Sequence, residues 1–258
     1  MMNEFADRVA VVTGAARGIG RAIAGQLHAR GARVILVDCN AAALADAAES
    51  MPRPDGSGAR SVVADLAEPA AIEALASQVA AFEPTVDVLV NNAGIEVDMA
   101  FENITADCFD RVIAVNLRGP LLVSQAMAPL FPSSGGAIVN ISSIHADHAF
   151  PNSIPYACSK AGLVALTRNL ALELAPRRIR VNAVCPGYID TPMWDQWLLT
   201  ASNPEALASQ TEALHPLGRR GLPDDIASAV AYLAGPQSAW ITGTCLVVDG
   251  GLTVRTHP

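Results

Sequence analysis

Continuous runs of apolar residues alternate with stretches at helical spacing along most of the chain. Seven runs are rich in Val, Ile and Leu, and polar residues do not alternate within them: 8–14, 33–38, 61–66, 86–94, 136–142, 179–187 and 244–251. Such runs are typical of strands buried on both faces, as in a parallel sheet. Between them, segments rich in Ala and Leu, such as 22–31 and 71–82, predict helices. The alternation predicts an α/β fold, a doubly wound parallel sheet of about seven strands with helices on both faces.

One segment interrupts this rhythm. Residues 192–223 hold Trp194, Trp197 and several prolines, and they are too polar and interrupted for a core helix. The segment is also too long for an ordinary connection. We therefore expect residues 188–222 to form a substrate-binding lid within a single domain that spans residues 1–258.

The composition narrows the class of protein. Hydrophobic residues make up 51% and charged residues 16% of the chain, which argues against disorder. The net charge of the chain is −8, whereas nucleic-acid-binding proteins usually carry an excess of basic residues. No apolar stretch is long enough to span a bilayer, and five scattered cysteines without a CxxC pair indicate free thiols in a reducing compartment. We expect a cytoplasmic protein that binds neither nucleic acid nor membrane.

A glycine-rich turn, TGAARGIG (13–20), follows the first apolar run. It lets the backbone approach a pyrophosphate at the N-terminus of the next helix, through Gly14, Gly18 and Gly20. The spacing is GxxxGxG rather than GxGxxG, so it also fits an ordinary strand–helix turn. Asp38 ends the second run, where a carboxylate accepts hydrogen bonds from the adenosine ribose and repels a 2′-phosphate. Asp38 therefore favours NAD over NADP, whereas Arg17 in the turn argues for NADP.

Asp65 ends the third run and has two interpretations. It is placed to contact the edge of the adenine, and an aspartate before a helix is also a common cap.

The stretch YACSK (156–160) contains the only lysine of the chain. Tyr156 and Lys160 lie one helical turn apart and share a helix face, with or without a chemical role. A phenol titrates at about 10, and a cation one turn away favours the phenolate. Tyr156 can then remove a hydroxyl proton as hydride leaves for the cofactor. A lysine suits this place because its ammonium is a compact donor, whereas a guanidinium is bulky, planar and permanently protonated.

Five motifs occur in order at fitting separations: TGAARGIG, NNAG (91–94), NISS (140–143), YACSK and PGYIDT (186–191). Over residues 9–251 the chain resembles the classical short-chain dehydrogenase/reductase family, whose fold is Rossmann-like. The resemblance implies that Ser143 steadies the substrate oxygen and that Tyr156 is the general acid/base. It implies that Lys160 lowers the pKa of Tyr156 and holds the nicotinamide ribose. Asn116 would hold a water that links Lys160 to solvent.

The resemblance also implies the cofactor contacts and the assembly. The NAD site would be formed by Gly14, Arg17, Gly18, Ile19, Gly20, Asp38, Asp65, Leu66, Asn92, Ala93, Gly94, Tyr156, Lys160, Pro186, Gly187, Ile189 and Thr191. A homotetramer would form through the helices after Thr105 and Pro155 and through the C-terminal strand. Cys158 is the one departure, since small residues are usual there, and it is either a packing residue or a thiol made reactive by the nearby lysine.

Four residues near the expected reacting carbon bear on the substrate: Glu96, His145, Asn152 and Trp194. Glu96 suits a polyhydroxyl substrate and repels a carboxylate. His145 can donate or accept a hydrogen bond, or lie in a surface loop. Trp194 offers an apolar face to a sugar ring or packs within the lid. HADH (145–148) suggests a metal, but no third ligand is spaced nearby, so we expect no metal site.

The sequence therefore predicts an NAD-dependent dehydrogenase that interconverts a secondary alcohol and a ketone or lactone. NNAGIE and SSIH are similar to glucose 1-dehydrogenase-like members of the family, which favours a sugar or polyol as the small-molecule substrate. The alternatives within the family are a 3-oxoacyl-thioester reductase and a hydroxy-acid dehydrogenase. A catalytically silent NAD-binding or scaffold protein is the non-enzyme alternative, and the complete set of four catalytic residues argues against it.

Overall fold

A parallel sheet organises the part of the chain that the computed structural model describes, residues 3–52 and 58–255. Within these residues seven strands pair in the order β3-β2-β1-β4-β5-β6-β7, and every neighbouring pair is parallel. They are β1 (Val9–Thr13), β2 (Arg33–Asp38), β3 (Arg60–Val63), β4 (Val88–Asn91), β5 (Gly136–Ile141), β6 (Ile179–Pro186) and β7 (Cys245–Val248). The strand order reverses between β1 and β4, so the predicted doubly wound sheet is confirmed.

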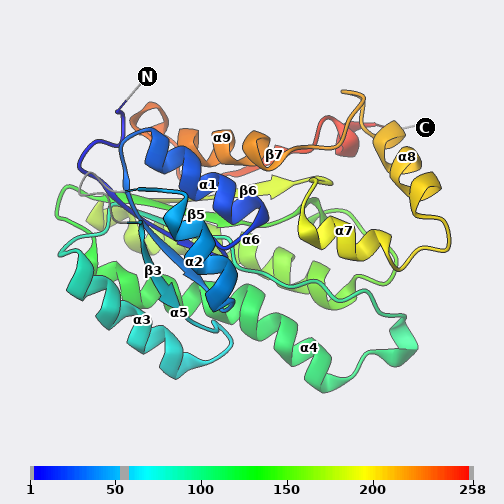
Figure 1. Cartoon of the computed structure of the whole chain (residues 1–258), viewed down its shortest axis with the longest axis horizontal. Coiled ribbons are helices and arrows are strands. Elements are labelled where there is room, and N and C mark those ends of the chain that lie inside the picture. Colours follow the sequence, from blue (N-terminus) through cyan, green and yellow to red (C-terminus); the bar gives the residue numbers. More distant parts are fainter. Residues whose placement is uncertain (1–2, 53–57, 256–258) are drawn as a thin grey trace.

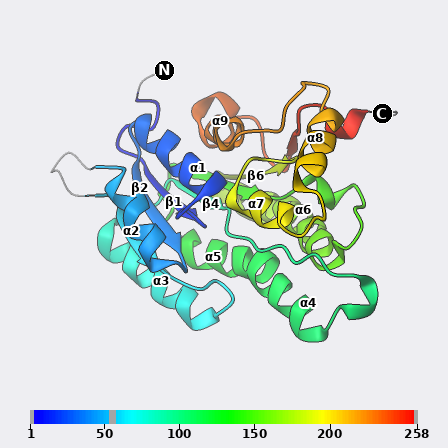
Figure 2. The ribbon, with the colours of Figure 1, turned by 45° about the vertical axis from the view of Figure 1, so that its right-hand side comes forward.

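Helices cover both faces of the sheet (Figures 1 and 2). One face carries α1 (Gly18–Ala29), α2 (Ala41–Glu49) and α9 (Pro223–Ala234), and the other carries α3 (Pro69–Phe82), α5 (Gly119–Met127) and α6 (Ile154–Leu174). α4 (Ala106–Ile113) precedes α5 and contacts α6. No helix among the described residues has the length and apolar character needed to cross a membrane.

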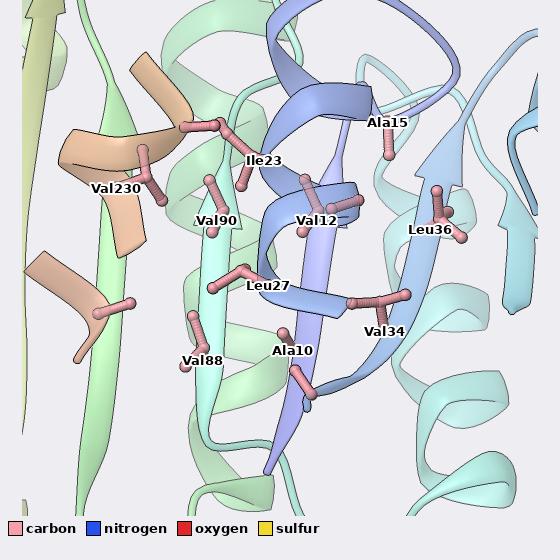
Figure 3. Packing of buried hydrophobic residues seen from close by; sticks show 14 of the residues in the cluster. Ala10, Val12, Ala15, Ile23, Leu27, Val34, Leu36, Val88, Val90 and Val230 are labelled. Carbon is pink, nitrogen blue, oxygen red and sulfur yellow. The ribbon is translucent and has the colours of Figure 1, made fainter. Parts of the chain in front are cut away.

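Two hydrophobic cores lie on opposite faces of the sheet. Along β1, Ala10 and Val12 point into the core under α1, whereas Val9 and Val11 point into the core under α3 and α5. Figure 3 shows Ile23 and Leu27 of α1 packed over the first of these faces. Because inner strands are buried on both sides, most residues along them are apolar, which explains the long apolar runs. The edge strands β3 and β7 are partly exposed instead.

The segment 188–222 contains two short helices that the sequence analysis did not predict. They are α7 (Pro192–Leu198) and α8 (Pro204–Leu214), and each begins with a proline after a capping side chain, Thr191 or Asn203. The two ends of the segment lie side by side, because Ile189 and Gly221 form a parallel bridge. Both helices lie beyond the carboxyl ends of the strands (Figure 1), where ligands bind in open α/β sheets.

Candidate active site

The glycine-rich turn connects β1 to α1 and leaves no room for a side chain at Gly14 or Gly20. Gly14 has a φ of +64°, and a Cβ there would lie 2.7 Å from Nδ2 of Asn92. A Cβ on Gly20 would lie 2.1 Å from the carbonyl oxygen of Gly14. Asn92 Nδ2 donates to the carbonyl oxygens of Thr13 and Gly14 at 2.9 and 3.0 Å. This turn fits a pyrophosphate, since the backbone is bare and no side chain caps the N-terminus of α1.

Asp38 is fixed beside the same turn. Its Oδ2 accepts a hydrogen bond from the amide of Ala16 at 3.1 Å, and its Oδ1 accepts one from the amide of Asn40 at 2.9 Å. The carboxylate therefore lies at the carboxyl end of β2, where the sequence places the adenosine ribose. Arg17 is exposed on the turn.

Asp65 differs from the expectation in two respects. β3 ends at Val63, so Asp65 lies two residues beyond the strand, and the N-cap of α3 is Glu68. Its carboxylate accepts from the amide of Ala67 at 3.0 Å and pairs with Arg111 at 2.9 Å. The helix-cap interpretation is therefore wrong.

The other predicted cofactor residues surround the end of the sheet. Thr191 Cγ2 would lie 3.5 Å from a Cβ on Gly18, so the segment after β6 meets the glycine-rich turn. The Ala93 amide donates to Oγ1 of Thr13 at 3.1 Å, which fixes the NNAG stretch against β1. Gly187 approaches Asp249 closely, with 2.9 Å between its Cβ position and the Asp249 Cβ. The remaining predicted residues follow these elements: Ile19 on α1, Leu66 after β3, Pro186 at the end of β6 and Ile189 at the bridge.

Ser143, Tyr156 and Lys160 meet at the end of β5. Ser143 Oγ accepts from the amide of His145 at 3.2 Å and forms a hydrogen bond with Tyr156. Lys160 Nζ donates to the carbonyl oxygen of Ile141 at 2.8 Å and lies 5.3 Å from the centroid of the Tyr156 ring. One turn of α6 and the end of one strand therefore bring a hydroxyl, a phenol and an ammonium together.

Asn116 completes the group from a different element, the π-helical turn η2 (Ala114–Arg118) between α4 and α5. Its Oδ1 accepts from the amide of Ile95 at 2.9 Å, and its Nδ2 donates to the Ile95 carbonyl at 2.8 Å and to Ser159 Oγ at 3.0 Å. A Cβ on Gly94 would lie 3.4 Å from Asn116 Oδ1 and 3.5 Å from Lys160 Nζ. The four residues of the predicted tetrad therefore lie at one place.

Burial dominates the electrostatics of this group. It lowers the pKa of Lys160 to about 8, and Glu96 offsets part of that change. The pKa of Tyr156 is raised above its usual value by burial and by Glu96, while the hydrogen bond with Ser143 acts in the opposite sense. The protein groups alone thus shift the Tyr156 pKa opposite to the expected direction, because burial and Glu96 outweigh the hydrogen bond with Ser143.

His145 lies against Tyr156 rather than in a surface loop. Its ring stacks on Phe150 with centroids 4.0 Å apart and meets the Tyr156 ring edge-on at 5.3 Å. Nδ1 of His145 forms a hydrogen bond with Ser153 Oγ at 2.7 Å. Burial lowers the pKa of His145 to about 4, so the imidazole is neutral at neutral pH and offers one ring nitrogen as a donor or acceptor.

Glu96 places a largely buried carboxyl close to Lys160 and Tyr156. Burial, and to a lesser degree the neighbouring Asp98, raises the pKa of Glu96 to about 7, whereas Lys160 lowers it. Near neutral pH some molecules carry the protonated carboxyl, which can donate a hydrogen bond, and others carry the carboxylate, which only accepts. Asn152 is exposed, with a φ of 60°, and its carbonyl accepts from the amide of Met99 at 2.9 Å.

Three rings from segment 188–222 form an aromatic wall, which we define as Tyr188, Trp194 and Trp197. Tyr188 lies 5.6 Å from Trp194 and 5.9 Å from Trp197, centroid to centroid, and the two tryptophans are 5.0 Å apart. Tyr188 also meets Phe150 at 6.2 Å, which joins the wall to His145 and Tyr156. Tyr188 and Phe150 are not among the residues predicted from the sequence, although Tyr188 lies inside the PGYIDT motif.

Two further expectations concern thiols and metals. Cys158 is exposed on α6, so it does not pack in the core of the chain. In the described part of the chain, no group of three or more His, Cys, Asp or Glu side chains is arranged to hold a metal ion.

A glycine-lined turn beside a carboxylate at the end of β2, next to a phenol and an ammonium, is the arrangement of a nucleotide-dependent oxidoreductase that acts on CH–OH groups. The likeness to known proteins is consistent with that class. A family model described as enoyl-(acyl carrier protein) reductase matches residues 14–253. The chain belongs to the classical short-chain dehydrogenase/reductase family.

Individual relatives match over nearly the whole chain. The (3R)-3-hydroxyacyl-CoA dehydrogenase of Rattus norvegicus is 42% identical over 255 residues, which cover 95% of each chain. The ligand-free aldohexose dehydrogenase of Thermoplasma acidophilum has a TM-score of 0.89 at 35% identity, covering 100% of this chain and 98% of its own. A blue fluorescent protein from a metagenomic library, solved with NADPH, has a TM-score of 0.87 at 36% identity, covering 96% and 99%. The two relatives named dehydrogenases, with the family match, place the chain among oxidoreductases that act on alcohol and ketone substrates.

Proposed function

We propose that this protein is an NAD-dependent dehydrogenase that interconverts a secondary alcohol and a ketone or lactone of a sugar or polyol. Asp38 supports NAD, because its carboxylate is held at the end of β2, where a 2′-phosphate would meet a negative charge. The relative solved with NADPH makes the choice between NAD and NADP an experimental question.

The bound nicotinamide supplies the hydride acceptor for oxidation, and the protein handles the proton. Ser143 donates its hydroxyl hydrogen to the substrate oxygen, since its own oxygen already accepts from the amide of His145. Tyr156 takes the proton of the substrate hydroxyl, and Lys160 stabilises the resulting charge from the same face of α6. Asn116 holds the loop at Ile95 against α6 through its hydrogen bonds to Ile95 and Ser159. Gly94, the preceding residue of this loop, has no side chain and therefore leaves room beside Lys160.

The proposed substrate class, a sugar or polyol, rests mainly on Glu96. Its carboxyl is electrostatically coupled to Tyr156, and His145 and the aromatic wall lie nearby. A carboxyl and a neutral imidazole can pair with several hydroxyl groups, and an indole face suits the apolar side of a sugar ring. The structural neighbour named aldohexose dehydrogenase supports the same class.

A hydroxyacyl thioester is the second candidate, together with a hydroxy acid. The rat relative, named (3R)-3-hydroxyacyl-CoA dehydrogenase, favours it. A negatively charged Glu96 opposes a substrate whose carboxylate lies close to the carbinol.

A substrate panel tests the proposal. Sugars, polyols, hydroxy acids and a 3-hydroxyacyl thioester are offered with NAD and with NADP, and the absorbance of the reduced nicotinamide is followed. We expect turnover of a sugar or polyol with NAD and none in Tyr156→Phe, while Tyr232→Phe, a change at an exposed tyrosine of α9, retains activity. Turnover confined to hydroxy acids or thioesters, or a preference for NADP, would overturn the assignment.

We further propose the organisation around this chemistry. Residues 1–258 form one domain in which segment 188–222 closes over the substrate, and four copies assemble. The partly exposed edge strand β7 supports assembly through the C-terminal strand. Free thiols at all five cysteines support a reducing compartment, the cytoplasm.

A further inference from the structure

Arg220 lies where the last residues of segment 188–222 return to the sheet. Its side chain is 14% exposed, although it belongs to a segment on the outside of the molecule. A guanidinium this buried needs matched acceptors, since an unpaired one is costly. Its partners therefore show what it holds in place.

These partners come from three parts of the segment. Nε donates to Asp190 Oδ1 at 2.6 Å, just before α7, and one terminal nitrogen donates to Glu212 Oε1 at 3.0 Å on α8. The same nitrogen reaches the Ala208 carbonyl oxygen at 3.4 Å. The guanidinium carbon also lies 4.8 Å from the centroid of the Trp194 ring. One cation thus joins the base of the segment, both of its helices and one face of the aromatic wall.

The other side of the wall is fixed separately. Trp197 forms a hydrogen bond with Asp98, in the stretch that follows β4 and Glu96. Tyr188, the third ring of the wall, meets Phe150. Arg220 contacts Trp194, and Trp194 contacts Tyr188. These two rings therefore lie between Arg220 and the reacting group.

We propose that Arg220 is a positioning residue, which sets Trp194 and Trp197 as the substrate-facing wall and thereby controls affinity for the alcohol rather than the chemical step. The cation–π contact and the two carboxylate bonds stabilise one arrangement of α7 relative to α8. The substrate part of this proposal rests on the function proposed above, whereas the placement of the two tryptophans does not.

The neighbouring Arg219 provides a matched control. It carries the same charge, pairs with Asp225 at 2.7 and 2.9 Å and donates to the carbonyl oxygen of Arg220 at 2.9 Å. Its side chain is 52% exposed, and among the described residues none of these hydrogen bonds goes to α7 or α8. Arg219→Gln and Arg220→Gln therefore remove the same charge one residue apart. Arg220→Lys retains the charge and loses the planar fork.

Fluorescence provides a readout that needs no substrate. The three tryptophans are Trp194, Trp197 and Trp240, and Trp240 is fully exposed. In a Trp240→Phe background the tryptophan fluorescence comes from Trp194 and Trp197 alone. We expect acrylamide to quench them more strongly in Arg220→Gln, to an intermediate degree in Arg220→Lys, and to an unchanged degree in Arg219→Gln.

Kinetics then separate positioning from a general loss of structure. In Arg220→Gln the KM for the alcohol should rise about tenfold, with kcat and the Kd of NAD changed by less than about twofold. Equal quenching in the two Gln variants, or equal losses of kcat and NAD binding in both, would overturn the proposal. Stronger quenching in an enzyme that turns over no sugar or polyol would support the positioning role and contradict the proposed substrate instead.

Discussion

Lys160 shows how one side chain is constrained on several sides. Nζ is held by the Ile141 carbonyl at 2.8 Å, and a Cβ on Gly94 would already lie 3.5 Å from it. Burial lowers the pKa of Lys160 to about 8, so this ammonium can exchange a proton near neutral pH. A guanidinium is larger and does not release its proton.

Lys160→Arg should therefore lose turnover although it keeps a positive charge. We expect kcat to fall by a factor of at least about 10², measured by nicotinamide absorbance, while circular dichroism shows an intact fold. Arg168→Lys, a change on the same helix, serves as the reverse control and should leave kcat unchanged. Near-normal turnover of Lys160→Arg would show that proton exchange at this site is not required.

Glu96 predicts a pH effect with a definite sign. Its pKa is raised to about 7, and its negative charge above that pH raises the pKa of Tyr156. Alcohol oxidation needs the deprotonated phenol, so activity rises with pH as Tyr156 loses its proton. Glu96→Gln removes the negative charge and favours the phenolate.

The acidic limb of kcat/KM for oxidation should thus move to lower pH in Glu96→Gln, by about 1 pH unit. The measurement is a pH profile of kcat/KM for wild type and variant. Glu102→Gln, at an exposed glutamate of the same connection, should leave the profile in place. A shift to higher pH would contradict the coupling between Glu96 and Tyr156.

At the scale of elements, the pairing of α9 with β6 depends on Arg180. Its guanidinium reaches the C-terminal end of α9, where helix carbonyls lack partners within the helix. The acceptors are the carbonyls of Leu233, Ala234, Gly235 and Ile241 and the hydroxyl of Ser238, at 2.7 to 3.4 Å. These bonds fix the last turn of the helix to the sheet.

Arg180→Ala should destabilise the fold by about 3 kcal/mol, because several buried acceptors lose their donor. For a chain of this size that corresponds to a Tm lower by roughly 6–12 °C, measured by calorimetry. Arg177→Ala removes an exposed arginine that has one bond, to the Ala128 carbonyl, and should change the Tm by less than about 3 °C. Equal shifts in the two variants would contradict the capping role.

Elements that are buried on both faces were predictable from the sequence, and elements that face the substrate were not. β1 and β2 lie within their apolar runs, because burial on two sides demands continuous hydrophobicity. α7 was missed, since its two rings pack on one another and on Tyr188 instead of on the sheet. α8 was missed because Thr211 is its one buried residue, so its sequence carries no buried apolar stripe.

The candidate site divides in the same way. The tetrad was located by its motifs, and the structure brings its four members together. The contacts of Tyr188 with Phe150, and of Arg220 with Trp194, join residues far apart in sequence through single side chains. Such pairs leave no periodic pattern, so only the folded chain reveals them.

At the scale of the whole molecule, the sheet formed by the described residues ends in two edge strands, β3 and β7, with different expected surroundings. Val247 on β7 is 46% exposed and Val63 on β3 is 57% exposed. If four copies assemble through the C-terminal strand, only the β7 edge is covered in the assembly. The same substitution at the two edges then has different consequences.

Val247→Asp should release smaller species, whereas Val63→Asp should keep the assembly. Light scattering on the wild type should give four times the chain mass of 26.8 kDa. An aspartate introduced into a buried apolar contact costs several kcal/mol, enough to dissociate it at micromolar concentration. A monomeric wild type, or a tetramer that persists in Val247→Asp, would contradict assembly through this strand.

The π-helical turn η2 separates the rotational phases of α4 and α5. A turn of this kind holds one residue more than an α-helical turn, so the residues before it rotate by about 100° relative to those after it. Asn116 is aimed at Ile95 and Ser159 by that offset. Deleting one residue from Ala114–Arg118 would restore continuous α-helix and turn the amide away. The orientation of the Asn116 amide thus depends on the number of residues in this turn as much as on the identity of residue 116, and substitutions on the outer face of α4 should leave that orientation unchanged.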